Sequence, residues 1–423
     1  MKKTLGLLLL LSSTVLARQL TLDQAIELSL ENSKEIKVSS MAAEKARLNV
    51  GVAFKKALPS VVYNGSYTRS EYGRDIYKNN DTRVNAKGGY NQKITISQPL
   101  FQGGAITGGI KYAKANRQIA DLSFLGQKRD TRLDTIQIYS DIVKNQRDLE
   151  ALKASRHRLS VTHEKQKAQL DLRLITKSDL LKTEYSILEV DSNIIRTNNL
   201  ITVNKEKLRI KIGLPKNEDI TVVDFDVPTN LSHSINFQAD LNQAMEKSID
   251  AMIAKYSVDM ADASKTVARA DMLPQVSAFG SYGVENERTK YNATTDDAEW
   301  RGGIKVSWNV FEFGKNYDNY KIADLNKQQE ELKEKISQDN IDVRVTDAYL
   351  NLIKMEKERE SKGRALEAAQ ENYDIDREKY ISGLISTVDF LISETQLRDA
   401  RVQYNQVVVD YLYAFEKYRS MLI

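Results

Sequence analysis

Histidine and cysteine, the residue types that most often carry catalysis or bind transition metals, are scarce in this chain. Its three histidines are His157, His163 and His233, and it has no cysteine. His157 and His163 are six residues apart, whereas two metal ligands on one helix face are three or four apart. Without cysteine there is no thiolate metal site, no disulfide and no attachment point for an N-terminal lipid. The sequence therefore predicts no enzyme, no metal site and no cofactor.

Two further patterns resemble chemical motifs but fit structural roles better. Gly104 and Gly109 have the spacing of a phosphate-binding loop, yet Ile110 stands where that loop needs a lysine. The acidic pair at 296–297 falls in an expected loop, where solvated carboxylates are commoner than a catalytic pair. The charge-rich run 354–362 is typical of the outer face of a coiled coil. None of these patterns predicts a reaction.

The composition indicates an elongated, solvent-rich shape, and the N-terminus indicates export. Of its 423 residues 41% are apolar and 28% are charged, which is lean for a compact globule of this size. A net charge of +4 is too small to predict a nucleic-acid partner. Residues 1–17 combine Lys2 and Lys3 with a short leucine-rich run and end at Ala17, the pattern of a secretory signal peptide. The apolar run falls short of the roughly 20 residues that a transmembrane anchor needs.

The chain repeats itself. Leu58-Pro59-Ser60-Val61 is echoed by Leu273-Pro274-Gln275-Val276 at an offset of 215. From Ile94 and Ile304 onward the offset is 210, and it persists as far as Glu184 and Glu394. The change of five residues falls in a polar loop, where a change of length is tolerated. We therefore expect a first repeat at 18–215, a linker at 216–236 and a second repeat at 237–423.

Each repeat is expected to contain two strands, at about 61–72 and 88–99 and again at about 275–286 and 299–310. The last of these alternates apolar residues such as Ile304 and Val306 with polar ones such as Arg301 and Lys305. One interpretation is a half-buried strand in a soluble sandwich. The other is a lipid-facing strand with aromatics near the membrane interfaces, here Tyr63, Tyr67, Tyr90, Tyr282, Trp300 and Trp308. On that interpretation the polar tips at about 73–86 and 285–297 are external loops.

Helices are expected to fill most of the remaining chain. Each repeat opens with one, at about 20–54 and 237–270, and Thr21 to Gln24 supply a start signal for the first. Long helices follow at about 100–213 and 311–423. In the first repeat neither Gly nor Pro occurs between Gly126 and Gly213, so a helix can run without a break there. In the second repeat a coiled-coil spacing of 4, 3, 4 and 3 joins Ile341, Val345, Ala348, Leu352 and Met355.

The number of strands constrains the assembly. Four strands per chain cannot close a membrane barrel, whose smallest natural members have about eight. Open edges in lipid would leave backbone groups unpaired at several kcal/mol each. If the strands span a membrane, several chains must share one barrel, and three copies supply twelve strands. The predicted fold is therefore mainly α with a membrane β-barrel, in which a homotrimer forms a 12-stranded barrel continued by an α-helical barrel.

Three segments carry a resemblance to a known family. Ser97 to Gly104 (Ser-Gln-Pro-Leu-Phe-Gln-Gly-Gly) resembles the segment that ends the first strand pair in TolC-like outer-membrane efflux proteins. Leu208 to Pro215 resembles the close of their first half, and Tyr380 to Asp389 resembles the turn between the two periplasmic helices of their second half. The order and duplication of these segments extend the resemblance over nearly the whole mature chain.

The resemblance implies a trimeric channel in the outer membrane with a large periplasmic portion. Its partners would be a periplasmic adaptor, an inner-membrane pump or ABC exporter, and outer-membrane lipid. The channel would give a passive exit to delivered substrates, with iris-like opening of the periplasmic helical tip. Which cargo it carries, whether drug, metal, peptide or protein, is left open by the sequence.

The resemblance also implies a periplasmic gate. Asp389 occupies the position of a gate aspartate, Tyr380 that of a tyrosine in the closing network, and Asp179 that of an acidic partner. Ile392 and Ile385 depart from the pattern, since the reference channel has an aspartate and an arginine there. A ring of three Asp389 side chains would attract cations. Asp179 and Asp389 equally suit the capping of helices after Thr176 and Ser386, so capping and lumen lining both stay open.

One alternative of a different class is an exported coiled-coil structural protein or adhesin of the cell surface. It explains the helices, but it gives the strand pairs no role.

Overall fold

The computed structural model describes residues 18–68, 89–216, 218–286 and 298–422. The expected signal peptide and hairpin tips lie outside these residues, except for residues 285–286 at the start of the second tip. The chain forms two compact units. The first comprises Met1–Ser40, Ser123–Ala251 and Gln338–Ile423, and the second comprises Met41–Leu122 and Met252–Ser337. Among the described residues, no helix carries an apolar stretch long enough to cross a membrane.

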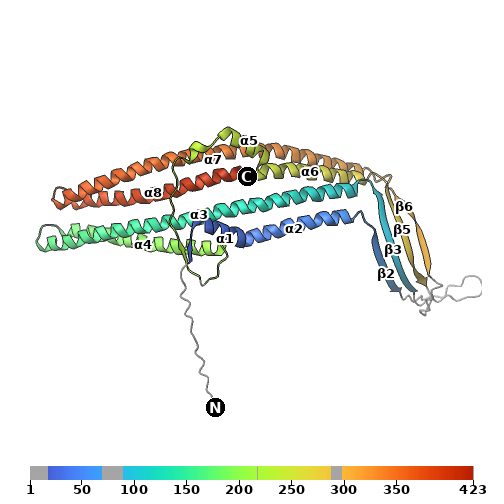
Figure 1. Cartoon of the computed structure of the whole chain (residues 1–423), viewed down its shortest axis with the longest axis horizontal. Coiled ribbons are helices and arrows are strands. Elements are labelled where there is room, and N and C mark those ends of the chain that lie inside the picture. The colour runs from blue at the N-terminus through green and yellow to red at the C-terminus, as the bar shows by residue number, and fades with distance from the viewer. Residues whose placement is uncertain (1–17, 69–88, 217, 287–297, 423) are drawn as a thin grey trace, which may run out of the picture. The chain divides into compact units, whose positions relative to one another are not determined.

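The helices occur in pairs of equal length (Figure 1). Helices of 11 and 22 residues recur at an offset of 215, and helices of 67 and 35 residues recur at an offset of 210. The pairs are α1 Leu22–Asn32 with α5 Phe237–Lys247, α2 Lys34–Lys55 with α6 Ile249–Ala270, α3 Ala105–Asp171 with α7 Lys315–Ile381, and α4 Lys177–Lys211 with α8 Thr387–Met421. The two offsets are those found in the sequence.

The opening helix of each repeat differs from its expected course. The expected start is correct, because Thr21 and Gln24 form a capping box that begins α1. However, the helix expected to run unbroken from Leu20 to Phe54 ends at Ser33, where ψ is 127°. The second repeat breaks in the same way at Ser248, where ψ is 151°. The Ser248 hydroxyl accepts from the Ala251 N–H at 3.3 Å and so caps the next helix, which compensates for the interrupted backbone bonds.

Four antiparallel strands form one sheet in the second unit, in the order β2-β3-β5-β6 (Figure 1). Their bounds are β2 Ser60–Thr68, β3 Gly89–Gln102, β5 Gln275–Asn286 and β6 Glu299–Ser307. β3 runs three residues past the expected end at Pro99, because the register with β5 shifts between Pro99 and Phe101 and pairing then resumes. β6 stops three residues before the expected position 310.

The strand register collects the apolar residues on one face of the sheet. Tyr63 pairs with Ile94, Ile94 with Tyr282, and Tyr282 with Trp300, so these four side chains form one row across all four strands. All four are exposed, Trp300 to 80%. The opposite face alternates with this one and carries polar residues such as Lys93 and Arg301. An exposed apolar row of this kind indicates a surface that contacts something other than water.

The core of the first unit is built around a short parallel sheet of β1 Arg18–Leu20 and β4 Ile220–Val222. The Tyr139 hydroxyl lies 2.8 Å from the Leu20 carbonyl oxygen and 2.7 Å from that of Val223, so it joins the two strands. Burial raises the pKa of Tyr139 to about 12, and the nearby Asp224 carboxylate adds to the shift. The hydroxyl therefore stays protonated and remains a donor at every physiological pH.

The chain between the repeats is held by residues of α7 and α8. The Tyr411 hydroxyl accepts from the Leu231 N–H at 2.7 Å and donates to Glu356 Oε2 at 2.9 Å. Desolvation of Glu356 opposes ionisation, but hydrogen bonds from Ser232 and Tyr411 outweigh it and lower the pKa of this carboxyl. The expected linker at 216–236 is thus anchored at a defined place, and it contains β4 and the short 3-10 helix Leu231–Ser234.

Candidate gate site

Two tight turns join the long helices and carry the residues expected to form a gate. The first, between α3 and α4, contains Arg173 at φ +61°, and the second, between α7 and α8, contains Gly383 at φ +74°. In each turn the next residue donates a 2.8 Å backbone hydrogen bond to a carbonyl of the preceding helix, Leu174 to Gln169 and Leu384 to Lys379. The two turns therefore have the same αL helix ending, although only the second uses glycine.

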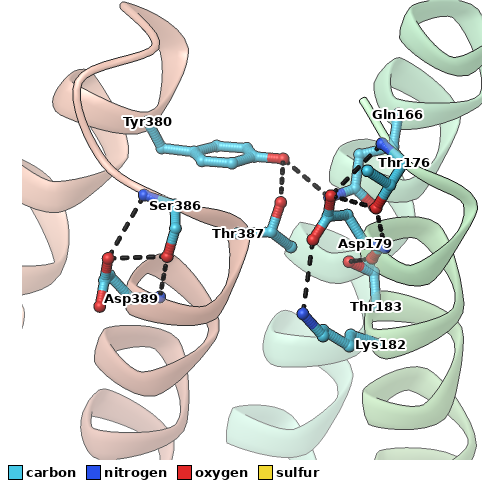
Figure 2. Close-up of polar contacts among 9 residues, drawn as sticks. All are labelled: Gln166, Thr176, Asp179, Lys182, Thr183, Tyr380, Ser386, Thr387 and Asp389. Atoms are coloured by element: carbon cyan, nitrogen blue, oxygen red, sulfur yellow. Dashed lines mark hydrogen bonds and ion pairs between the residues drawn. The ribbon is translucent and has the colours of Figure 1, made fainter. Parts of the chain in front are cut away.

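Asp179 caps the start of α4 (Figure 2). Its carboxylate accepts from the Thr176 hydroxyl at 2.6 Å and from the Thr176 N–H at 3.3 Å, while its own N–H donates to Thr176 Oγ1 at 3.2 Å. Lys182, one turn along the helix, lies 3.5 Å from the other carboxylate oxygen. The hydrogen bond from Thr176 is the main cause that holds the pKa of Asp179 below its ordinary value.

Asp389 caps α8 in the same way (Figure 2). Its carboxylate accepts from the Ser386 hydroxyl at 2.7 Å and from the Ser386 N–H at 3.3 Å. The position that corresponds to Lys182 is Ile392, so Asp389 lacks the cation that stands one turn away in the first repeat. The capping role expected for both aspartates is confirmed. Lining of a lumen stays a prediction for each.

Tyr380 links the two repeats. Its hydroxyl accepts a 2.7 Å hydrogen bond from Gln166 Nε2 on α3 and lies 3.5 Å from Thr387 Oγ1 at the start of α8 (Figure 2). Its ring stacks on Phe390 with centroids 4.7 Å apart and planes inclined by 14°. Gln166 is fully buried, although nothing in its sequence neighbourhood distinguishes it from other coiled-coil glutamines. Sequence reasoning therefore missed it.

A buried ion pair lies near this link, and it too was missed from the sequence. Arg158 Nη2 on α3 donates to Glu394 Oε1 on α8 at 2.8 Å, and the Glu394 side chain is only 1% exposed. The Arg158 guanidinium also sits over the ring of Tyr373 on α7, 5.3 Å from its centroid. The site thus consists of two capped turns and two polar contacts that run from the first repeat to the second.

The expected interfacial aromatics all belong to the second unit. Among those whose side chains are described, Tyr63, Tyr67, Tyr282, Trp300 and Trp308 are exposed. Trp308 follows the end of β6, and its ring N–H donates to the Met272 carbonyl at 3.1 Å. Tyr90 pairs with Tyr67 through the backbone, and its side chain lies outside the described atoms. The residues are arranged as an interfacial role requires, but that role stays a prediction.

The same fold occurs in outer-membrane channels of several bacteria. The Campylobacter jejuni CmeC outer membrane channel superposes with a TM-score of 0.85 at 16% identity, covering 95% of this chain and 85% of that one. The Vibrio cholerae outer membrane protein VceC gives 0.81 at 13% identity, covering 95% of each chain. A crystal structure of CusC gives 0.82 at 16% identity, covering 95% and 91%.

Sequence comparison then identifies the family. The profile of the outer membrane efflux protein family matches residues 25–213 and again residues 241–422. The chain belongs to this family, and it is an outer-membrane efflux channel protein rather than an enzyme. A curated relative, the probable outer membrane lipoprotein SilC of Salmonella typhimurium, is 22% identical over 386 residues, which cover 87% of this chain and 78% of the relative.

Proposed function

We propose that three copies of the chain form one channel that gives delivered substrates a passive exit across the periplasm and the outer membrane. The observation that carries this proposal is the four-stranded sheet. Within the described residues β2 and β6 each pair with one neighbour only, and the apolar row from Tyr63 to Trp300 is exposed. In lipid, unpaired strand edges are too costly to persist, and joining β6 of one copy to β2 of the next removes them. Three copies give a closed barrel of twelve strands.

The helices of the second unit support assembly between copies. On α7 the exposed apolar residues Ile322, Leu325, Leu332 and Ile336 are spaced 3, 7 and 4, which is an a/d heptad stripe interrupted once. On α2 the exposed residues Met41, Leu48 and Val52 are spaced 7 and 4, which fits the same pattern. These two stripes lack a partner within the described second unit. A second copy that joins β2 to β6 would bring α2 to α7, so that each stripe covers the other.

The gate in this proposal lies at the turns that carry Asp179 and Asp389. Three symmetry-related Asp389 carboxylates would surround the axis of the tube and attract cations to its periplasmic end. Asp389 suits this role better than Asp179, because Ile392 leaves it without the lysine that neutralises its counterpart. Opening would move the hairpin of α7 and α8 against the hairpin of α3 and α4, as an iris does.

The proposed partners follow from membership of the family and from the absence of a motor in the sequence. Ile110 removes the one phosphate-loop candidate, so a pump must supply the energy, with a periplasmic adaptor joining it to the channel. The runner-up function, an exported coiled-coil adhesin, gives the exposed aromatic row of the sheet no role.

Reconstitution of the purified protein in planar bilayers, with native mass spectrometry in detergent, tests the proposed function. We expect a trimer with stepwise single-channel currents. Because Trp300 and Trp308 are the only tryptophans, their fluorescence should be quenched by lipids brominated near the headgroup more strongly than by lipids brominated at the chain end. A soluble monomer without conductance would overturn the proposal and favour the adhesin.

A further inference from the structure

The buried ion pair between the two repeats has no role in the gate described so far. Arg158 lies on α3, in the first hairpin (α3 and α4), and Glu394 lies on α8, in the second hairpin (α7 and α8). Their 2.8 Å contact joins residues 236 positions apart. We propose that Arg158 and Glu394 are positioning residues that hold the two hairpins in the arrangement seen here, and that opening of the channel breaks their ion pair. This inference rests on the proposed function.

The environment of the pair shows why separating the hairpins would be costly. Glu394 is 1% exposed and Arg158 is 28% exposed, so the carboxylate is sealed from water while the guanidinium reaches it from the side. A buried charge is stabilised by its partner, and removing the partner leaves that charge uncompensated in an apolar surrounding. An arrangement that withdraws Arg158 must therefore also hydrate Glu394 or lose stability.

Arg158 penetrates the second hairpin rather than touching its surface. Its guanidinium lies over the Tyr373 ring, and Tyr373 packs in the core of the second hairpin with Phe390 and Leu397. The Arg158 Nε atom is buried and has no hydrogen-bond partner in the described structure. The Arg158 side chain thus contacts both helices of the second hairpin, Tyr373 on α7 and Glu394 on α8. It acts as a wedge that fixes the position of the second hairpin relative to the first.

The pair forms only between the first hairpin and the second hairpin of one chain. At the offset of 210 the counterpart of Glu394 is Glu184, which is exposed, and the counterpart of Arg158 is Ala368. The link between Gln166 and Tyr380 is equally unrepeated, because its counterparts are Asp376 and Leu170. In a trimer, the junction between neighbouring chains would therefore lack this contact. The ion pair acts within a chain, and Glu184 offers a matched control at the equivalent position.

The test is the open probability of the reconstituted full-length channel, measured beside the melting temperature of its trimer. We expect Glu394→Gln and Arg158→Gln each to raise the open probability at least about fivefold, which is the low end of the range for coupling between sites. Glu184→Gln should leave it at the parent value. The double variant should open no more often than the more open single variant, since both changes break one contact.

Other outcomes decide against the inference. If the single variants melt earlier but open as often as the parent, the pair is only structural and the proposal is wrong. Additive effects of the two changes would also overturn it. If the glutamine variants do not assemble, Arg158→Lys and Glu394→Asp keep both charges and should raise the open probability less; parent-like opening in assembled trimers of both would overturn the proposal. A parent protein that conducts no current contradicts the proposed function instead, so the two failures are distinct.

Discussion

Gln166 and Tyr380 lie 214 residues apart in sequence, yet the amide of one donates to the hydroxyl of the other at 2.7 Å. The other amide atom, Gln166 Oε1, is buried and has no partner in the described structure. The tyrosine hydroxyl is thus the only hydrogen-bond partner that the structure gives to this buried amide group. The hydrogen bond between the two repeats at Gln166 therefore depends on one atom, the hydroxyl oxygen of Tyr380.

Replacing Tyr380 with phenylalanine removes that oxygen and keeps the ring on Phe390. The buried Gln166 amide then loses its acceptor, at a cost of about 1–3 kcal/mol. We expect the melting temperature to fall and the open probability in bilayers to rise. Tyr185→Phe on α4 is the control, because Tyr185 is exposed. If both variants open equally often, Tyr380 does not belong to the closing contacts.

Asp389→Asn removes the negative charge that the proposed ring at the channel axis needs, while the amide oxygen can still cap α8. Block of single-channel current by divalent cations should therefore weaken, with little change in melting temperature. Asp399→Asn, ten residues along the same helix, is the control that keeps Asp389. Block that is unchanged in the Asp389 variant would place this carboxylate outside the lumen.

The cap formed by Asp179 should make stability depend on pH. Because the folded pKa lies below the ordinary value of 3.8, the cap contributes fully above that value and is lost as the pH falls through the folded pKa. An amide at 179 can still cap α4, but it loses the attraction to Lys182, for which Asp389 has no counterpart. Asp179→Asn should therefore lower Tm at pH 6, and the difference from the parent should shrink between pH 4 and pH 2.5. Thermal unfolding followed by circular dichroism measures both. A difference that stays constant over this range would show that ionisation of Asp179 does not matter.

The apolar stripe on α7 should control assembly. Leu332 is 59% exposed, and a second copy would bury it, so Leu332→Glu should cost about 2 kcal/mol or more per interface. The expected result is loss of trimer in native mass spectrometry with helix content retained. Asn326→Glu adds the same charge at an exposed position outside the stripe and should still assemble. Equal behaviour of the two variants would remove the stripe from the interface.

The first turn should tolerate glycine better than its own residue. Arg173 holds φ +61°, a conformation that disfavours side chains, and its side chain is exposed. Arg173→Gly should stabilise the protein by about 1 kcal/mol, and Gly383→Arg at the matching position should destabilise it by a similar amount. Chemical denaturation measures both changes. If Arg173→Gly does not stabilise the protein and Gly383→Arg does not destabilise it, the turns are held by contacts beyond their backbone.

Features that depend on a single short segment of the chain could be predicted from the sequence. The alternation of Ile304 and Val306 with Arg301 and Lys305 predicted the faces of the sheet, and Thr21 with Gln24 predicted the start of α1. The break at Ser33 was missed, because serine within a helical pattern is tolerated and only the extended backbone there shows the interruption.

The contacts between repeats could not be predicted in the same way. Whether Gln166 meets Tyr380, or Arg158 meets Glu394, depends on which face of α3 turns toward α7 and α8. Each partner lies more than 200 residues away, and each looks like an ordinary polar residue of a coiled coil. The aspartate caps were local and could be proposed from Thr176 and Ser386. The wedge formed by Arg158 was not local, and only the packed hairpins reveal it.

The equal lengths of the paired helices limit how such a chain can change in evolution. Each of the four helix pairs has kept its length, while the offset between the copies shifts by five residues between β5 and β6. Insertions and deletions have thus been accepted in the hairpin loop, where they disturb no pairing. A deletion of a few residues in α7 alone would pull Tyr380 away from Gln166 and Asp389 out of step with Asp179. Related chains should therefore gain or lose helical residues in both copies together or not at all, and their loops should carry most of the variation in length.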